Sequence, residues 1–133
     1  MKRTPIPAIL APLLVLALPG CGLVEAEVRH FDEERTYEHA LFESPEACEA
    51  AQPPDFFINC SQWMDFHPDG RVTVVLSDII NPGTYRIRDV RVTLTMEGSP
   101  ELPNRIELLL SADESTLVEE ATGRVWTRAS DGG

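Results

Sequence analysis

The stretch that decides the fold is SQWMDFHPDGRVTVVLSDIINPGTYRIRDVRVTLTM, residues 61–96. Apolar and polar side chains alternate along most of it, most regularly in residues 71–77 and 84–96. Alternation with a period of two residues is typical of β-strands that bury one face and expose the other. HPDG at residues 67–70 separates two such runs and predicts a hairpin turn, because Asp-Gly accepts the positive φ angles of that turn.

The same alternation continues toward the C-terminus, in residues 105–110 and in a last hairpin at 117–128. We expect turns at residues 81–83, 98–103 and 112–115, which leaves about seven strands at a spacing of roughly 8–12 residues. No segment between these strands is long enough for the helix of a parallel crossover. The sequence therefore predicts a mainly β domain, an antiparallel meander that forms a small β-barrel or a sandwich.

One short helix is expected before this region, over residues 45–51. Ser44 suits the cap position, Pro45 the first helical position, and Glu46 the positive end of the helix dipole. The two prolines at 53–54 end the helix.

The segment upstream of the helix gives weaker signals. Val24, Val28 and Phe31 recur at helical spacing and favour a short helix. Residues 37–42 fit either a first strand or the end of a helix, and the sequence leaves both open.

Residues 61–128 resemble the small lipocalin-like barrels of bacterial envelope lipoproteins. The resemblance implies an antiparallel barrel that binds a ligand or a partner protein. Its motifs are the polar-Asp-Gly turn at residues 67–70, the Gly83-Thr84-Tyr85 strand, a turn with Leu110, Ser111 and Asp113, and a last strand with Trp126 and Arg128.

The first 21 residues, MKRTPIPAILAPLLVLALPGC, have the pattern of an export signal. Two positive charges precede an apolar run at residues 8–18, which is too short to span a bilayer and fits a secretory signal. The ending resembles the lipobox of bacterial lipoproteins, with Leu18, a small Gly20 and Cys21. The resemblance implies cleavage before Cys21 and acylation of its sulfur and new N-terminus, palmitate being a typical acyl group.

This interpretation divides the chain into three parts. Residues 1–20 are the predicted signal peptide, 21–34 the lipidated N-terminus and tether, and 35–130 the barrel domain. Gly22 rather than Asp follows the lipidated cysteine, which in Gram-negative sorting implies the outer membrane. We therefore expect a cell-envelope protein held at the outer membrane by its lipid and facing the periplasm.

The expected mature chain is strongly acidic. Residues 21–133 contain nine arginines, no lysine and 22 acidic residues, for a formal charge of −13. This charge makes nucleic acid an improbable partner and leaves membrane attachment to the acyl chains. It favours cationic proteins or peptides, although solubility alone also explains an acidic surface.

Cys48 and Cys60 remain as a pair once Cys21 is lipidated. In an exported protein such a pair predicts a disulfide, with a contribution of about 3 kcal/mol for a loop of roughly 13 residues. Metal ligation and a redox pair are the alternatives, and neither is supported by a C-x-x-C motif.

Catalytic and metal-binding signals are sparse. The sequence has neither a serine on a glycine-flanked elbow nor a cysteine with an evident histidine partner, so we predict that the chain is not an enzyme. A metal site could also be built from His30 and His39 with Asp32, Glu33 or Glu38. Exposed polar residues explain them better, and we expect no metal and no cofactor.

Three arginines carry a more specific hypothesis. Arg86, Arg88 and Arg91 lie on the polar faces of adjacent predicted strands and would form a basic stripe. The stripe would contact either the acidic N-terminal segment or an anionic ligand. The simpler alternative is a solvated outer face with scattered ion pairs.

These observations favour a non-enzymatic binding or structural lipoprotein, whose partner is a small apolar ligand or another envelope protein. The second interpretation is an inhibitor of a cationic hydrolase such as lysozyme, or of a protease, because an acidic surface speeds encounter with a basic enzyme.

Overall fold

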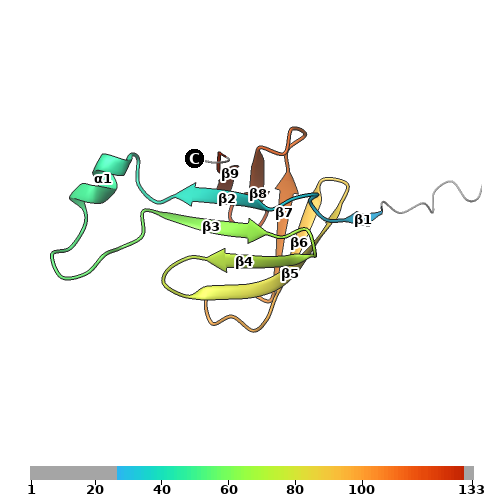
Figure 1. The fold of residues 1–133 in the computed structure, drawn as a ribbon, viewed down its shortest axis with the longest axis horizontal. Helices are drawn as coiled ribbons and strands as arrows, with labels where there is room; N and C mark the ends of the chain where they lie inside the picture. The colour runs from blue at the N-terminus through green and yellow to red at the C-terminus, as the bar shows by residue number, and fades with distance from the viewer. Residues whose placement is uncertain (1–26, 131–133) are drawn as a thin grey trace, which may run out of the picture.

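The computed structural model describes residues 27–130, which form a closed antiparallel β-barrel with one short helix at one end (Figure 1). The predicted signal peptide and Cys21 lie outside the described residues. The elements are β1 (Val28–Arg29), β2 (Arg35–Ala40), α1 (Pro45–Ala50), β3 (Ser61–Phe66), β4 (Arg71–Val75), β5 (Ile80–Arg88), β6 (Arg91–Met96), β7 (Arg105–Leu110), β8 (Thr116–Glu119) and β9 (Val125–Arg128).

Eight strands, β2 to β9, make the barrel, each pairing with the next in the chain. The barrel closes where β2 pairs with β9, at Tyr37 with Arg128 and Glu38 with Thr127. β1 lies along β5, with Val28 opposite Arg88. The meander is confirmed, and of the two predicted forms the structure has the barrel. The predicted number of about seven strands is one short, because residues 35–40 form strand β2 and so include most of the stretch 37–42 that the sequence left open.

Every second residue along each strand faces the barrel interior, and these side chains pack against one another. The largest, Trp126, Tyr37 and Phe66, are at most 1% exposed. A barrel of eight strands is just wide enough for its own side chains to fill it. The core cluster consists of Phe31, Tyr37, Met64, Phe66, Val72, Val74, Tyr85, Ile87, Val92, Leu94, Met96, Ile106, Leu108, Leu110, Leu117 and Trp126.

One end of the barrel is closed by the segment that precedes β2. Phe31 is 2% exposed and packs against Tyr37, Phe66 and Tyr85 at centroid distances of 6.1, 5.4 and 5.7 Å. Its backbone N–H donates to the Tyr85 hydroxyl at 3.0 Å. We call residues 30–34 the plug. The helix expected near Val28 and Phe31 is wrong, and the folded unit includes residues of the stretch expected to be tether.

Ion pairs join the residues that flank the plug to Glu114 in the β7–β8 turn. Arg35 donates to Glu114 at 2.5 Å, and Arg29 contacts the other carboxylate oxygen at 3.2 Å. Tyr37 donates its hydroxyl to the backbone carbonyl of Glu114 at 2.7 Å. The hydrogen bond from Arg35, more than any other interaction, holds the pKa of the Glu114 carboxyl below its ordinary value.

The turn expected at residues 81–83 is wrong, because these residues belong to β5. Asn81 is buried and donates to the carbonyl of Val74 at 3.1 Å, which aligns the strand instead of breaking it. Gly83 is required in the strand, since a Cβ there would lie 2.6 Å from the carbonyl oxygen of Thr95. The chain reverses earlier, at residues 76–79.

The other local predictions are confirmed. Helix α1 starts after Ser44, whose hydroxyl accepts from the Ala47 N–H at 3.0 Å, with Pro45 in the first turn. The turn at residues 67–70 joins β3 to β4, and Gly70 has the positive φ of 96°.

Candidate functional site

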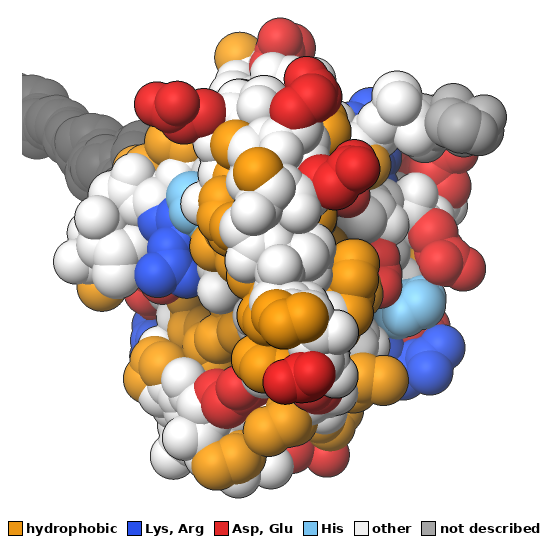
Figure 2. Space-filling view, turned by 90° about the vertical axis from the view of Figure 1, so that its left-hand side faces the viewer, with side chains coloured by type: hydrophobic (Ala, Val, Ile, Leu, Met, Phe, Trp, Pro, Cys, Tyr) orange, Lys and Arg blue, Asp and Glu red, His pale blue; other side chains and the backbone are white. Residues whose placement is uncertain are grey.

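Large apolar side chains are exposed at the end of the barrel that carries α1. Phe56 and Phe57 lie in the loop after α1 and are 64% and 71% exposed. Leu41, just after β2, and Ile79 and Ile80, at the β4–β5 turn, are exposed at the same end of the barrel. We call these five residues the end patch. Figure 2 looks onto this end and shows hydrophobic side chains gathered over it.

A groove runs through this surface. It has a volume of about 360 Å³, and its lining joins the α1–β3 loop to the β4–β5 turn. A second hollow of about 280 Å³ lies on the other side of Phe42. The first groove is lined by Leu41, Phe42, Phe56, Phe57, Ile58, Asn59, Leu76, Ser77 and Asp78.

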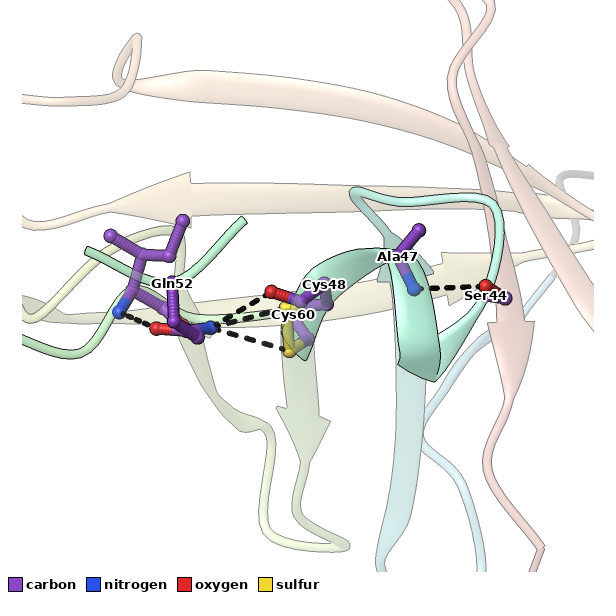
Figure 3. Close-up of a disulfide and its surroundings, with 6 residues drawn as sticks. Ser44, Ala47, Cys48, Gln52 and Cys60 are labelled. Atoms are coloured by element: carbon purple, nitrogen blue, oxygen red, sulfur yellow. Dashed lines mark hydrogen bonds between the residues drawn. A yellow bond between two sulfur atoms is a disulfide. The ribbon is translucent and has the colours of Figure 1, made fainter. Parts of the chain in front are cut away.

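The loop that carries the two phenylalanines is closed by a disulfide. Cys48 of α1 is bonded to Cys60, at the start of β3, as the sequence predicts, with the two Cα atoms 5.6 Å apart (Figure 3). Because Cys60 directly precedes a barrel strand, the bond ties the helix to the barrel. Removing freedom from the unfolded chain in this way stabilises the loop.

Gln52 holds the loop in a second way, which the sequence analysis missed. Its side-chain carbonyl accepts from the Ile58 N–H at 2.8 Å, and its amide donates to the Ile58 carbonyl at 2.9 Å. The same amide donates to the carbonyl of Cys48 at 3.3 Å (Figure 3). The hydrogen bonds to Ile58 close the segment 52–58, which carries Phe56 and Phe57.

The opposite side of the groove is fixed by polar contacts to the β6–β7 loop. Asn81 donates to one oxygen of Glu101 at 2.9 Å, and Ser77 donates to the other at 2.7 Å. Both hydrogen bonds, that of Ser77 foremost, lower the pKa of the Glu101 carboxyl. Asn59 donates to the carbonyl of Ser77 at 2.9 Å and joins the two sides. The groove walls are therefore held in place before any ligand binds.

The surroundings of the end patch are acidic. The four loops at this end, residues 41–60, 76–79, 97–104 and 120–124, carry eight acidic side chains and one arginine. Figure 2 shows acidic side chains on several sides of the hydrophobic area. A surface with an apolar centre and an acidic margin fits a partner that presents apolar side chains beside lysine or arginine.

The predicted basic stripe is only partly formed. Arg88 faces Arg91 across the β5–β6 hairpin, whereas Arg86 faces Thr93. Arg91 is ion-paired with Glu120. Arg86 and Arg88 are exposed and have no ion pair within residues 27–130, so among these residues they form no ion pair with the acidic N-terminal segment, although the backbone of Arg88 lies opposite Val28.

The histidines are not brought together. His30 packs edge-on against Tyr85, with centroids 5.1 Å apart, at the plug end. The Nδ1 of His39 lies 2.9 Å from the Val125 carbonyl oxygen, toward the other end of the barrel. Within the described part of the chain, no group of three or more His, Cys, Asp or Glu is arranged to hold a metal ion.

Two further findings lie outside the geometry of this end. None of the helices among residues 27–130 is long and apolar enough to cross a membrane. No protein-family model, curated protein or solved structure matches the chain. The end patch was only partly foreseeable, because the apolar run at 56–58 is visible in the sequence while its exposure depends on Gln52 and the disulfide.

Proposed function

We propose that this chain is an outer-membrane lipoprotein whose barrel is a non-enzymatic binding module for a basic envelope protein. The single observation that carries the binding role is the end patch, with exposed apolar side chains on a braced loop and an acidic margin. The lipobox at Cys21 supports the anchor and the periplasmic location. The barrel architecture agrees with the resemblance to small lipocalin-like lipoproteins.

A protein partner fits this surface better than an apolar molecule inside the barrel. The core side chains already fill the interior, so a ligand would have to occupy the open groove at the end. Aromatic side chains in the centre of a polar margin are the usual anchors of protein interfaces. A small apolar ligand in the groove of about 360 Å³ is a test outcome that would correct the proposal.

A second copy of the chain is a poorer occupant. Two end patches brought face to face would place sixteen acidic side chains around one contact, eight from each copy. Like charges across an interface cost several kcal/mol. The acidic margin therefore selects a basic partner over self-association.

The experiment that tests this proposal is photo-crosslinking in intact cells of the source bacterium. The full chain carries benzoylphenylalanine at position 57 in one sample and at position 90 in the control. Val90 is also an exposed apolar residue, but it lies at the opposite end of the barrel. We expect a discrete crosslinked protein of basic character from position 57 and not from position 90.

Affinity measurements on the purified pair complete the test. Phe56→Ala with Phe57→Ala should weaken binding by about 30-fold or more, as loss of interface anchors does. Val90→Ala should leave binding unchanged, and added salt should weaken it because the acidic margin contributes. No crosslink, an acidic partner, or equal affinity of the double variant would contradict the proposal.

The inhibitor interpretation is decided by the same experiment. A braced, protruding loop on an acidic surface also suits a protein that occupies the substrate cleft of a basic hydrolase. If the crosslinked partner is such an enzyme, its activity should fall in proportion to complex formation. A partner that keeps full activity in the complex would contradict inhibition.

A further inference from the structure

The arginines are distributed unevenly along the barrel. Seven of the nine in residues 27–130 lie on strand ends at the plug end, and only Arg105 and Arg124 belong to the end that carries the patch. The arginines of residues 27–130 are therefore concentrated at the end of the barrel where β1 lies, which Figure 1 labels.

One corner of that end is locally basic and partly apolar. It consists of residues 27–29 and 86–91, which lie together because β1 pairs with the last residues of β5. The corner holds four arginines against Glu27 and Asp89, in a described chain that is otherwise acidic. Val28 and Val90 are 43% and 47% exposed within it. Arginines beside exposed aliphatic side chains suit the headgroup layer of a membrane. The apolar methylene groups of arginine can lie against lipid while its charged guanidinium stays with the headgroups.

Two of these arginines are not neutralised by neighbours. Arg86 and Arg88 have no ion pair within residues 27–130, and Arg88 directly faces another arginine, Arg91. Like charges opposite each other in a sheet are destabilising, so the pair benefits from an external anion. Asp89 in the adjoining turn is the one acidic residue of that hairpin, residues 86–91.

The corner lies close in sequence to the predicted lipid anchor, which makes lipid phosphates the nearest anions. Arg88 lies opposite Val28, which is seven residues after Cys21. Seven residues reach at most about 25 Å. If Cys21 carries the lipid, the corner is kept within that distance of the bilayer surface, where lipid phosphates are abundant.

We infer that the barrel stands on this corner, with Arg86 and Arg88 against anionic lipid headgroups and the end patch pointing away from the membrane. The inference rests on the lipid anchor of the proposed function. The partner of the end patch would then approach from the aqueous side instead of lying in the same membrane. The overall negative charge of the chain reinforces this orientation, because the acidic end is repelled by the anionic surface.

The test is arginine footprinting with phenylglyoxal on the lipidated full-length product. The protein is reconstituted in vesicles rich in phosphatidylglycerol and, separately, in vesicles of phosphatidylcholine, and each arginine is followed by mass spectrometry. Modification of Arg86 and Arg88 should slow about 5-fold on the anionic vesicles, as expected for arginines at a charged surface. Arg105, exposed at the other end, is the internal control and should change less than about 2-fold.

A variant and a salt series sharpen the result. Arg29, in the same corner, should also be protected on the anionic vesicles. Arg86→Gln with Arg88→Gln should remove that protection, whereas Arg105→Gln should not. High salt should abolish the protection by screening. Equal protection of Arg86 and Arg105, or no protection at either, would overturn the inference.

The two proposals fail separately. If the intact mass shows no acyl chains and the protein does not bind vesicles, both the anchor and this orientation are overturned. The crosslinking at position 57 still decides the docking role. If the protein is acylated and footprinting shows no preferred end, the orientation alone is overturned.

Discussion

At one end of the barrel Phe31 is 2% exposed and touches three aromatic rings, while at the other end Phe57 is 71% exposed. The same side chain is a core residue in one place and a surface residue in the other. The plug end is held by packing and by the Arg35–Glu114 ion pair. The patch end is held by a disulfide and by hydrogen bonds from Gln52, which fix the backbone and leave its aromatic side chains free. The end of the barrel that carries the plug therefore contributes to stability, and the opposite end presents the surface proposed for recognition.

The largest effect should come from Phe31→Ala. Removing a fully packed aromatic ring from a core costs about 3–5 kcal/mol, so the urea midpoint should fall sharply. Phe57→Ala is the matched control at the other end and should change the free energy of unfolding by less than about 0.5 kcal/mol. If the two variants were equally stable, the contrast between the two ends would be wrong.

The next effect should come from Cys48→Ser with Cys60→Ser. Loss of the bridge should lower the free energy of unfolding by about 3 kcal/mol, from the loop-closure entropy it removes. Hydrogen exchange should accelerate mainly in residues 41–60, while the amides of β5 and β6 stay protected. Faster exchange spread evenly over all strands would show that the bridge supports the whole barrel.

A smaller effect is expected for Gln52→Ala. The variant loses the paired hydrogen bonds to Ile58, which should cost about 1 kcal/mol and raise the mobility of Phe56 and Phe57. Fluorine NMR of labelled phenylalanines measures that mobility directly. Glu49→Ala, exposed on helix α1, is the control, and an unchanged spectrum in Gln52→Ala would argue against the hydrogen bonds of Gln52 as the cause.

The smallest effect is expected in the pH dependence of the free energy of unfolding, through Glu114 at the plug end. Glu114 has a lowered pKa in the folded protein, so its contribution is present above its ordinary value of 4.5. The contribution is lost as the pH falls through the lowered pKa, because the unfolded state then binds the proton first. Acid unfolding curves should therefore be flatter for Glu114→Gln than for the parent chain below about pH 4.5. Identical curves for the two proteins would show that this ion pair does not stabilise the folded state.

The sequence predicts most of the barrel because alternation is a local signal. From Thr84 to Met96 the inward apolar residues of β5 and β6 each follow a polar one. Only the start of β5 was misassigned, since Asn81, Pro82 and Gly83 have the composition of a turn. Contacts with residues distant in sequence hold this stretch as a strand: Asn81 donates to Glu101, and the backbone of Thr95 approaches Gly83 closely.

The candidate site was harder to predict for the same physical reason. The cysteine pair and the Ser44 cap are local patterns, and both were read correctly. The exposure of Phe56 and Phe57 depends on which surfaces the loop meets after folding, and an apolar run looks the same whether it is buried or not. The plug was missed because Phe31 packs against strands that lie far along the chain.

The pairing of β2 with β9, which involves two residues of each strand, has a consequence for the order in which the barrel folds. Seven of the eight strand contacts in the barrel join neighbours in sequence, but this one joins the first barrel strand to the last, Tyr37 to Arg128. Such a distant contact costs more chain entropy than any hairpin and forms slowly. A chain that emerges from a ribosome or a translocation channel N-terminus first can build its hairpins one by one. It cannot become a cylinder until its last strand arrives, and until then β2 offers an open edge to chaperones and to other chains.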